Sequence, residues 1–145
     1  MNGLAYYASP IGVLEIRSEG DAITVVEYVR DDNKQPEYIT TVIQQCMEEL
    51  DEYFDKRRKF FDVKLKLMGT DFQQNVWTHL LDIPYGKTTY YADIATKVGD
   101  VNSVRAVGLA NGQNPIAIIV PCHRVIGKDG SMIGYGGGLE RKEWL

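Results

Sequence analysis

The chain has 145 residues, of which 44% are hydrophobic and 25% are charged, and its formal net charge at pH 7 is −4. This length fits one domain or two small ones, and the composition is that of a globular protein with its own core. No apolar run approaches the roughly 18 residues of a membrane span. The N-terminal sequence MNGLAYYASP also lacks the basic start and apolar middle of a signal peptide. We therefore expect no membrane partner and an intracellular location, in the cytoplasm or, in a eukaryote, the nucleus.

The charge is unevenly distributed along the chain. Residues 1–65 carry 13 acidic and 8 basic side chains, whereas residues 66–145 carry 7 acidic and 8 basic ones. The second half can therefore approach a phosphate backbone without strong repulsion.

Few residues are suited to bind a transition metal. The cysteines and histidines are Cys46, His79, Cys122 and His123. They form no CxxC pair, and their spacing is unsuitable for a tetrahedral zinc site. Two distant cysteines in an intracellular chain also do not predict a disulfide. We therefore expect no metal site.

The first half predicts a small sheet followed by a helix. Residues 3–29 contain three short segments rich in β-branched and aromatic residues, separated by turn compositions, and so predict a β-meander. Residues 36–57 then change to a helical period. The apolar positions of that face are Ile39, Ile43, Cys46, Leu50, Tyr53 and Phe54. Pro36 suits the first turn, and the basic run 56–59 suits the C-terminal end of the helix rather than a nucleic-acid patch. Cys46 is expected to be a buried, inert thiol.

A linker-like segment, residues 61–69, precedes the first helix of the second half. Thr70 and Gln73 have the spacing of a capping box. The expected buried stripe is Phe72, Val76, Trp77, Leu80 and Leu81. The helix should stop by Pro84, and His79 within it is expected to have a structural or surface role.

Two further helices predict a helix-turn-helix. One runs from Tyr91 to about residue 98 and ends at Gly99, and the next runs from Asn102 or Ser103 to about Asn111. The later helix contains three small residues: Ala106, Gly108 and Ala110. Glycine in a helix interior costs about 1 kcal/mol. Such a helix either approaches something closely or packs tightly against another element.

The segment VPCHRVIG follows an apolar run, residues 116–120, that predicts a strand. Pro121 should end this strand, so that Cys122 lies at its exit. His123 and Arg124 next to it could favour the thiolate. Nucleophilicity falls as a thiol's pKa falls, so a low pKa alone does not make a strong alkyl acceptor. The leaving group also needs an acid, and Tyr91 and Tyr135 are the candidates. The glycine-rich run around Tyr135 is either a lid or a connector to a last helix, residues 139–145.

The segment PCHRVIG, preceded by RAVGLANGQNPIAIIV and followed by GYGGGLERKEWL, closely resembles the O6-alkylguanine-DNA alkyltransferases. The resemblance extends from about Thr70 to Leu145. It implies an α+β protein: a small N-terminal domain of β-meander plus helix, residues 1–65, followed by a mostly helical, winged-helix-like domain, residues 66–145. The second domain would bind DNA through the helix-turn-helix and carry the reactive cysteine.

The resemblance also implies a function. The protein would bind double-stranded DNA containing O6-alkylguanine in the minor groove, flip the base out, and keep the alkyl group on Cys122 after one turnover, as a monomer without a cofactor. Activity on O4-alkylthymine and preference for alkyl size are left open. The implied catalytic residues are Cys122, His123 acting through a water, and Tyr91 as acid. The implied DNA-binding residues are Arg105, which fills the gap left by the base, Ala106, Gly108, Ala110 and Asn111. The implied pocket residues are Asn114, which orders the turn, Val125, Tyr135 and Gly136.

The sequence departs from the family at two places. The family usually carries a glutamate a few residues beyond KEWL, which completes a Cys–His–carboxylate relay, whereas this sequence stops at Leu145. Either the relay continues beyond Leu145 or it lacks its last member. Glu140 and Glu143 are present, but nothing in the sequence places either of them next to His123. Tyr90 stands where a serine commonly precedes the catalytic tyrosine. Three alternatives are a lesion-binding protein without repair activity, a cysteine hydrolase and a regulator that senses alkylation. Known lesion-binding relatives lack the cysteine, whereas this chain has Cys122. A cysteine hydrolase would turn over many substrate molecules. A regulator would need an additional activator domain.

Overall fold

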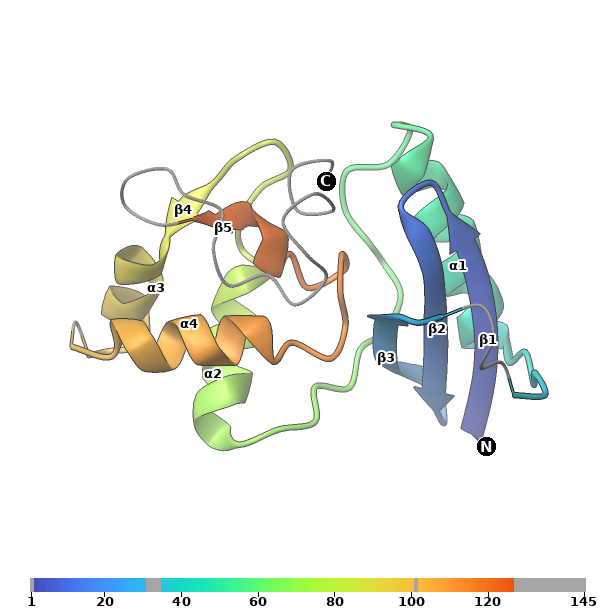
Figure 1. Ribbon diagram of the computed structural model, residues 1–145, viewed down its shortest axis with the longest axis horizontal. Helices are drawn as coiled ribbons and strands as arrows, with labels where there is room; N and C mark the ends of the chain where they lie inside the picture. Colours follow the sequence, from blue (N-terminus) through green and yellow to red (C-terminus); the bar gives the residue numbers. More distant parts are fainter. Residues whose placement is uncertain (1, 31–34, 101, 127–145) are drawn as a thin grey trace. The chain divides into compact units, whose positions relative to one another are not determined.

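The structure is a computed structural model that describes residues 2–30, 35–100 and 102–126. The chain divides into two compact units, Met1–Leu67 and Met68–Leu145. The first contains a three-stranded sheet with one helix, and the second is mostly helical (Figure 1). The prediction of an α+β fold is therefore confirmed.

The sheet of the first unit is an antiparallel meander, as the sequence predicts. It consists of β1 (Asn2–Ser9), β2 (Gly12–Glu19) and β3 (Ala22–Tyr28), in the order β1-β2-β3. Each connection is a two-residue turn, since Ser9 pairs with Gly12 and Glu19 pairs with Ala22. Gly20 in the second turn has φ +60°, a conformation that glycine adopts without steric cost.

Helix α1 (Thr41–Phe54) contacts all three strands and covers one face of the sheet (Figure 1). It begins five residues later than the sequence predicts. The Thr40 side chain caps it by accepting a hydrogen bond from the backbone of Ile43. Tyr38 instead forms an isolated bridge with Leu4, so the chain is still extended there, and Ile39 is exposed. The apolar face of the helix therefore begins at Val42 and Ile43.

The basic run follows the helix rather than ending it. The last turn of α1 holds no basic residue, and Asp55 is its C-cap. Arg57 pairs with Asp55, and Arg58 pairs with Glu52 at 2.8 Å. These intra-unit ion pairs agree with the interpretation that the run is not a nucleic-acid patch.

Much of the predicted linker belongs to the first unit. The backbone N–H of Ile23 in β3 donates to Lys64 (2.8 Å), and Lys66 donates to the carbonyl of Ile23 (2.9 Å). The buried carboxylate of Glu49 in α1 accepts hydrogen bonds from the backbone of Asp62 and Val63. The strand edge and the helix are therefore both tied to this segment.

The described part of the second unit contains three α-helices and a short parallel sheet. The helices are α2 (Asp71–Leu80), α3 (Tyr91–Lys97) and α4 (Val104–Gly112), and the strands are β4 (Thr89–Tyr90) and β5 (Val125–Ile126). The capping box of Thr70 and Gln73 is present, with bonds of 3.1 and 2.9 Å. Helices α3 and α4 contact each other, and both contact α2. Gly99 in the turn between α3 and α4 has φ +97°.

The buried stripe of α2 is narrower than predicted. Val76, Trp77 and Leu80 are buried, whereas Phe72 and Leu81 are exposed. The helix ends at Leu80 with Leu81 as its C-cap, so the helical period no longer places Leu81 on the buried face. None of the helices in the described ranges is long and apolar enough to cross a membrane.

Candidate active site

The segment before Cys122 is a buried turn and not the predicted strand. The Nδ2 group of Asn114 donates to the carbonyls of Ile116 (3.2 Å) and Val120 (2.8 Å), and its Oδ1 accepts from the Ile116 N–H (3.0 Å). One side-chain amide thus satisfies backbone groups that a strand would pair in a ladder. Ile118 has φ +71°, which is strained for a β-branched residue and incompatible with an extended chain. Ile116, Ile118, Ile119 and Val120 are buried although this segment forms no strand.

Cys122 is the first residue of a short 3-10 helix, η2 (Cys122–Arg124). Its side chain is only 4% exposed, and its backbone N–H donates to Val120. Arg124 anchors the other end of this helix, because its Nη1 donates to the carbonyl of Ile83 at 2.7 Å and its guanidinium lies 5.8 Å from the ring of Tyr85. The thiol is therefore presented by a tight turn that is fixed at both ends.

The β4–β5 pairing brings the end of η2 next to the start of α3. Thr89 pairs with Val125 and Tyr90 pairs with Ile126, so Tyr91 follows directly at the first position of α3. Tyr91 is buried, and burial raises its pKa. A negative charge on Cys122 raises this pKa further, and a hydrogen bond with Asn111 lowers it. The phenol of Tyr91 and the thiol of Cys122 therefore lie close enough to interact electrostatically.

Asn111 connects the same groups from helix α4. Its Nδ2 donates to the main-chain carbonyl of Cys122 at 3.3 Å, and its side chain lies near enough to Tyr91 to lower the pKa of the phenol. Helix α4 is itself held by Trp77, whose indole N–H donates to the carbonyl of Ala110 at 2.9 Å. Trp77 was predicted only as a buried residue, and Arg124 only as a neighbour that could favour the thiolate. Their anchoring contacts with Ala110 and Ile83 were not predicted.

His123 is buried immediately after Cys122, as the sequence order requires. Two carboxylates of the C-terminal segment, Glu140 and Glu143, lie outside the described residues. So do the pocket residues Tyr135 and Gly136, the glycine-rich run around them and the expected last helix.

The outer face of α4 carries only part of the predicted DNA-binding set. Arg105 and Ala106 are exposed. A Cβ built on Gly108 would meet no atom within 4 Å among the described residues, so packing within the described structure does not require this glycine. Leu109 is 65% exposed and adds apolar surface, which the sequence analysis missed.

Ala110 and Asn111 correct the prediction for this helix. Both are buried, with exposures of 2% and 1%. Helical periodicity explains the difference, because these positions share the inner face of α4 with Val107. Their side chains contact the interior of the unit rather than a ligand outside it.

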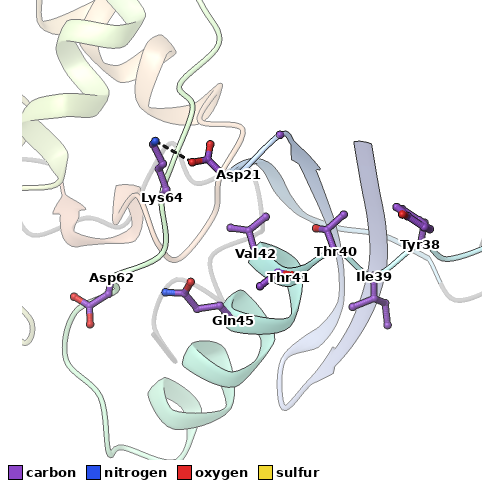
Figure 2. A pocket seen from close by; sticks show the side chains of 10 residues that line it. Asp21, Tyr38, Ile39, Thr40, Thr41, Val42, Gln45, Asp62 and Lys64 are labelled. Atoms are coloured by element: carbon purple, nitrogen blue, oxygen red, sulfur yellow. Dashed lines mark hydrogen bonds and ion pairs between the residues drawn. The ribbon is translucent and has the colours of Figure 1, made fainter. Parts of the chain in front are cut away.

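A hollow of about 590 Å³ lies in the first unit (Figure 2). Its wall includes Lys64 and Asp21, which form an ion pair at 3.0 Å, and the start of α1 at Thr40 and Thr41. None of the described residues that line it is a cysteine or a histidine. Within the described ranges, no group of three or more His, Cys, Asp or Glu side chains is arranged to hold a metal ion.

Both units match models of protein families. Residues 4–67 match the family described as "6-O-methylguanine DNA methyltransferase, ribonuclease-like domain". Residues 71–145 match the family described as "6-O-methylguanine DNA methyltransferase, DNA binding domain".

Individual relatives are similar over nearly the whole chain. A methylated-DNA–protein-cysteine methyltransferase of Mycobacterium leprae is 48% identical over 139 residues, which cover 92% of this chain and 84% of the relative. A protein of the same name from Methanosarcina acetivorans is 42% identical over 146 residues, covering 97% and 94%. The crystal structure of Mycobacterium tuberculosis OGT in complex with DNA has a TM-score of 0.86 and 46% identity, covering 95% of this chain and 86% of that one.

Proposed function

Because the chain belongs to the 6-O-methylguanine-DNA methyltransferase family, we propose that it repairs duplex DNA by taking the alkyl group of O6-alkylguanine onto its own Cys122. Each molecule acts once, as a monomer and without a cofactor. A genomic substrate places this activity in the cytoplasm or, in a eukaryote, the nucleus.

The observation that carries the proposal is the proximity of a nucleophile and an acid in one buried site. Cys122 lies at the start of the η2 turn, and a negative charge on its thiol raises the pKa of Tyr91. A hydrolase of the thiol–imidazole type needs a nucleophile and a base, but it does not need a buried phenol beside the thiol. Alkyl transfer from guanine needs such an acid beside the thiol, because the departing base must gain a proton.

The reaction is balanced by these groups. The Sγ atom of Cys122 attacks the alkyl carbon as the bond from that carbon to guanine O6 breaks. His123 accepts the thiol proton through a water, and Tyr91 donates a proton to the leaving guanine. The products are a thioether on Cys122 and an unmodified guanine, so the protein is consumed.

The outer face of α4 fits a close approach to DNA. Gly108 carries the cost of a glycine within a helix, and no described residue occupies the space that its missing side chain leaves. Together with the exposed Ala106, it gives a thin helix face that suits a narrow minor groove. Arg105, at the start of this face, would occupy the gap left by the flipped base.

The remaining pocket residues are assigned by the resemblance. Val125, Tyr135 and Gly136 would line the base pocket, and the backbone around Gly136 would bond O6. Asn114 acts differently from these, since its hydrogen bonds fix the turn that precedes the cysteine.

The stoichiometry of transfer tests this function. With an excess of duplex carrying O6-methylguanine, we expect about one methyl group per protein molecule, and then no further reaction, because a thioether is not hydrolysed. Continuing release of product would indicate a hydrolase. Tight binding without transfer would indicate a lesion-binding protein.

We expect Arg105→Ala to slow repair of methylated duplex by about 10- to 1,000-fold, because keeping a base unstacked costs a few kcal/mol. Reaction with free O6-alkylguanine should change less than about threefold, since a free base needs no flipping. Lys97→Ala is the matched control: it removes one exposed positive charge from α3 and should weaken duplex binding only modestly. Equal losses of Arg105→Ala on duplex and free base would contradict the base-displacing role.

A further inference from the structure

Leu109 on helix α4 is an exposed apolar residue that the site around Cys122 does not use. Its side chain is 65% exposed, more than that of any other large apolar residue in the described part of the second unit. A single exposed leucine is common on protein surfaces. The residues around it therefore decide whether it has a role.

Leu109 belongs to a row of residues on the outer side of α4, opposite the buried face. The row has the spacing i, i+3, i+4 and i+7 of a single helical face. This outer row consists of Arg105, Gly108, Leu109 and Gly112. Since two of the four residues are glycines, Leu109 supplies the one large apolar side chain of the row.

The glycines of the outer row let another surface approach the main chain of α4 beside the leucine. A Cβ built on Gly108 would meet no atom within 4 Å among the described residues. Glycine inside a helix is less stable than alanine, and packing within the described structure does not offset that cost. A leucine that projects beside such bare positions would enter the surface that lies against this face.

The charge of the outer row fits a polyanion. Arg105 lies one helical turn before Leu109, and α4 has no acidic residue. A face with one cation and no anion complements the duplex that the proposed function places against it. Proteins that bind the minor groove frequently insert apolar side chains, leucine among them, between base pairs and partly unstack them. The outer row thus combines a cation with a group suited to separate base pairs.

We propose that Leu109 is an apolar wedge that enters the minor groove beside Arg105 and loosens the stacking next to the damaged guanine. This inference rests on the proposed function, and it adds an uncharged residue to the one that fills the gap left by the base. Flipping a base requires that its stacking be broken. A wedge should therefore assist reaction with duplex DNA and have no effect on a free base.

The first test compares duplex and free base. Leu109→Ala should slow methyl transfer from subsaturating O6-methylguanine duplex by about 5- to 30-fold, because apolar surface buried in the groove is lost. Its reaction with free O6-alkylguanine should stay within about twofold of the wild type. The helix should persist, since alanine is the better helix former. Unchanged transfer from duplex, or equal losses on both substrates, would overturn the proposal.

Leu81→Ala is the matched control for this comparison. It removes the same atoms from another exposed leucine of the second unit, at the end of α2 and outside the outer row. Transfer from both substrates should stay within about twofold of the wild type. Leu109→Met should recover most of the loss seen in Leu109→Ala, because methionine is also an apolar wedge. A methionine variant as slow as the alanine variant would contradict a wedge.

Salt dependence separates an apolar wedge from an electrostatic contact. The slope of log affinity for duplex against log salt concentration should be the same for Leu109→Ala and the wild type. Arg105→Ala should reduce that slope by about one if the guanidinium meets a phosphate. A changed slope in Leu109→Ala would show that the substitution alters charged contacts, and would contradict the wedge.

Unstacking can be measured directly with 2-aminopurine, an adenine analogue that becomes more fluorescent when it is unstacked, placed on either side of the lesion. In Cys122→Ala, which binds without transfer, binding should raise this fluorescence, and the added Leu109→Ala should reduce the rise on at least one side. Equal rises with and without the leucine would refute the wedge. Failure of the wild type to accept methyl groups would instead refute the proposed function itself.

The competing occupant of the outer row is a second copy of the protein. In that case the wild type would self-associate without DNA, and Leu109→Lys would remain monomeric in sedimentation velocity. This result would overturn the proposal, whereas a wild type that is monomeric without DNA supports it.

Discussion

After incubation with methylated duplex, the wild-type protein should gain about 14 Da, the mass of one CH₂, and peptide mapping should place this gain on Cys122. Cys122→Ala should show no gain at all, because the thiol is the acceptor and no other group can replace it. Intact-mass measurement over time gives both results in one experiment.

The chain contains its own control, since it has a second cysteine. Cys46 lies on the buried face of α1, where burial and, to a smaller extent, the charge of Glu49 raise its pKa to about 12. At pH 7 only about one such thiol in 10⁵ is ionised. Cys46 should therefore remain unmodified, and Cys46→Ala should be labelled as fully as the wild type.

The outcome that contradicts the assignment is equally specific. A methyl group on Cys46, or a label that persists in Cys122→Ala, would show that the acceptor is elsewhere. An unmodified wild-type protein, with the duplex still methylated, would exclude alkyl transfer as the function.

Local sequence signals predicted those elements that depend on local interactions. The β-meander follows from short turns, and the start of α2 follows from Thr70 and Gln73, which complete each other's hydrogen bonds. The start of α1 was misplaced because Tyr38 pairs with Leu4, a contact between residues far apart in the sequence. The helical spacing of apolar residues alone cannot reveal such a long-range strand contact.

The segment before Cys122 also depends on interactions that the sequence pattern did not reveal. Residues 116–120 have the composition of a buried strand, and all of them except Ala117 are buried, but the amide of Asn114 and the positive φ of Ile118 turn the backbone. Composition reports burial and does not report which group satisfies the backbone. Likewise, Asn111 was assigned to DNA because it lies on the recognition helix, while its contact with the Cys122 carbonyl depends on how α4 packs.

Tyr91→Phe should slow methyl transfer from duplex DNA by about 10²- to 10⁴-fold, which is the usual contribution of a general acid. Affinity for the methylated duplex should change little, because phenylalanine keeps the ring and loses only the hydroxyl. Tyr90→Phe is the matched control: the same atom is removed from the preceding, exposed residue, and transfer should stay within about threefold of the wild type. Single-turnover rates at saturating DNA separate the transfer step from binding.

The pH dependence follows from the direction of the Tyr91 pKa. Burial first, and then the charge of Cys122, raise this pKa above the ordinary value, so the phenol keeps its proton as the pH rises through neutrality. Ionisation of Tyr91 should therefore cause no loss of transfer below about pH 10, where a free tyrosine titrates. A fall in rate that begins near neutrality and disappears in Tyr91→Phe would contradict this assignment.

The electrostatic interaction between Cys122 and Tyr91 also bears on when the phenol gives up its proton. While Cys122 is a thiolate, its charge holds the proton on Tyr91. As the bond from sulfur to carbon forms, that charge moves to the departing guanine, and the base becomes more basic. Proton donation is thus favoured only as the alkyl group leaves. A base whose anion is already stable needs this proton less, so Tyr91→Phe should lose less activity with leaving groups of lower pKa, and an equal loss for every leaving group would show that the hydroxyl acts only in packing.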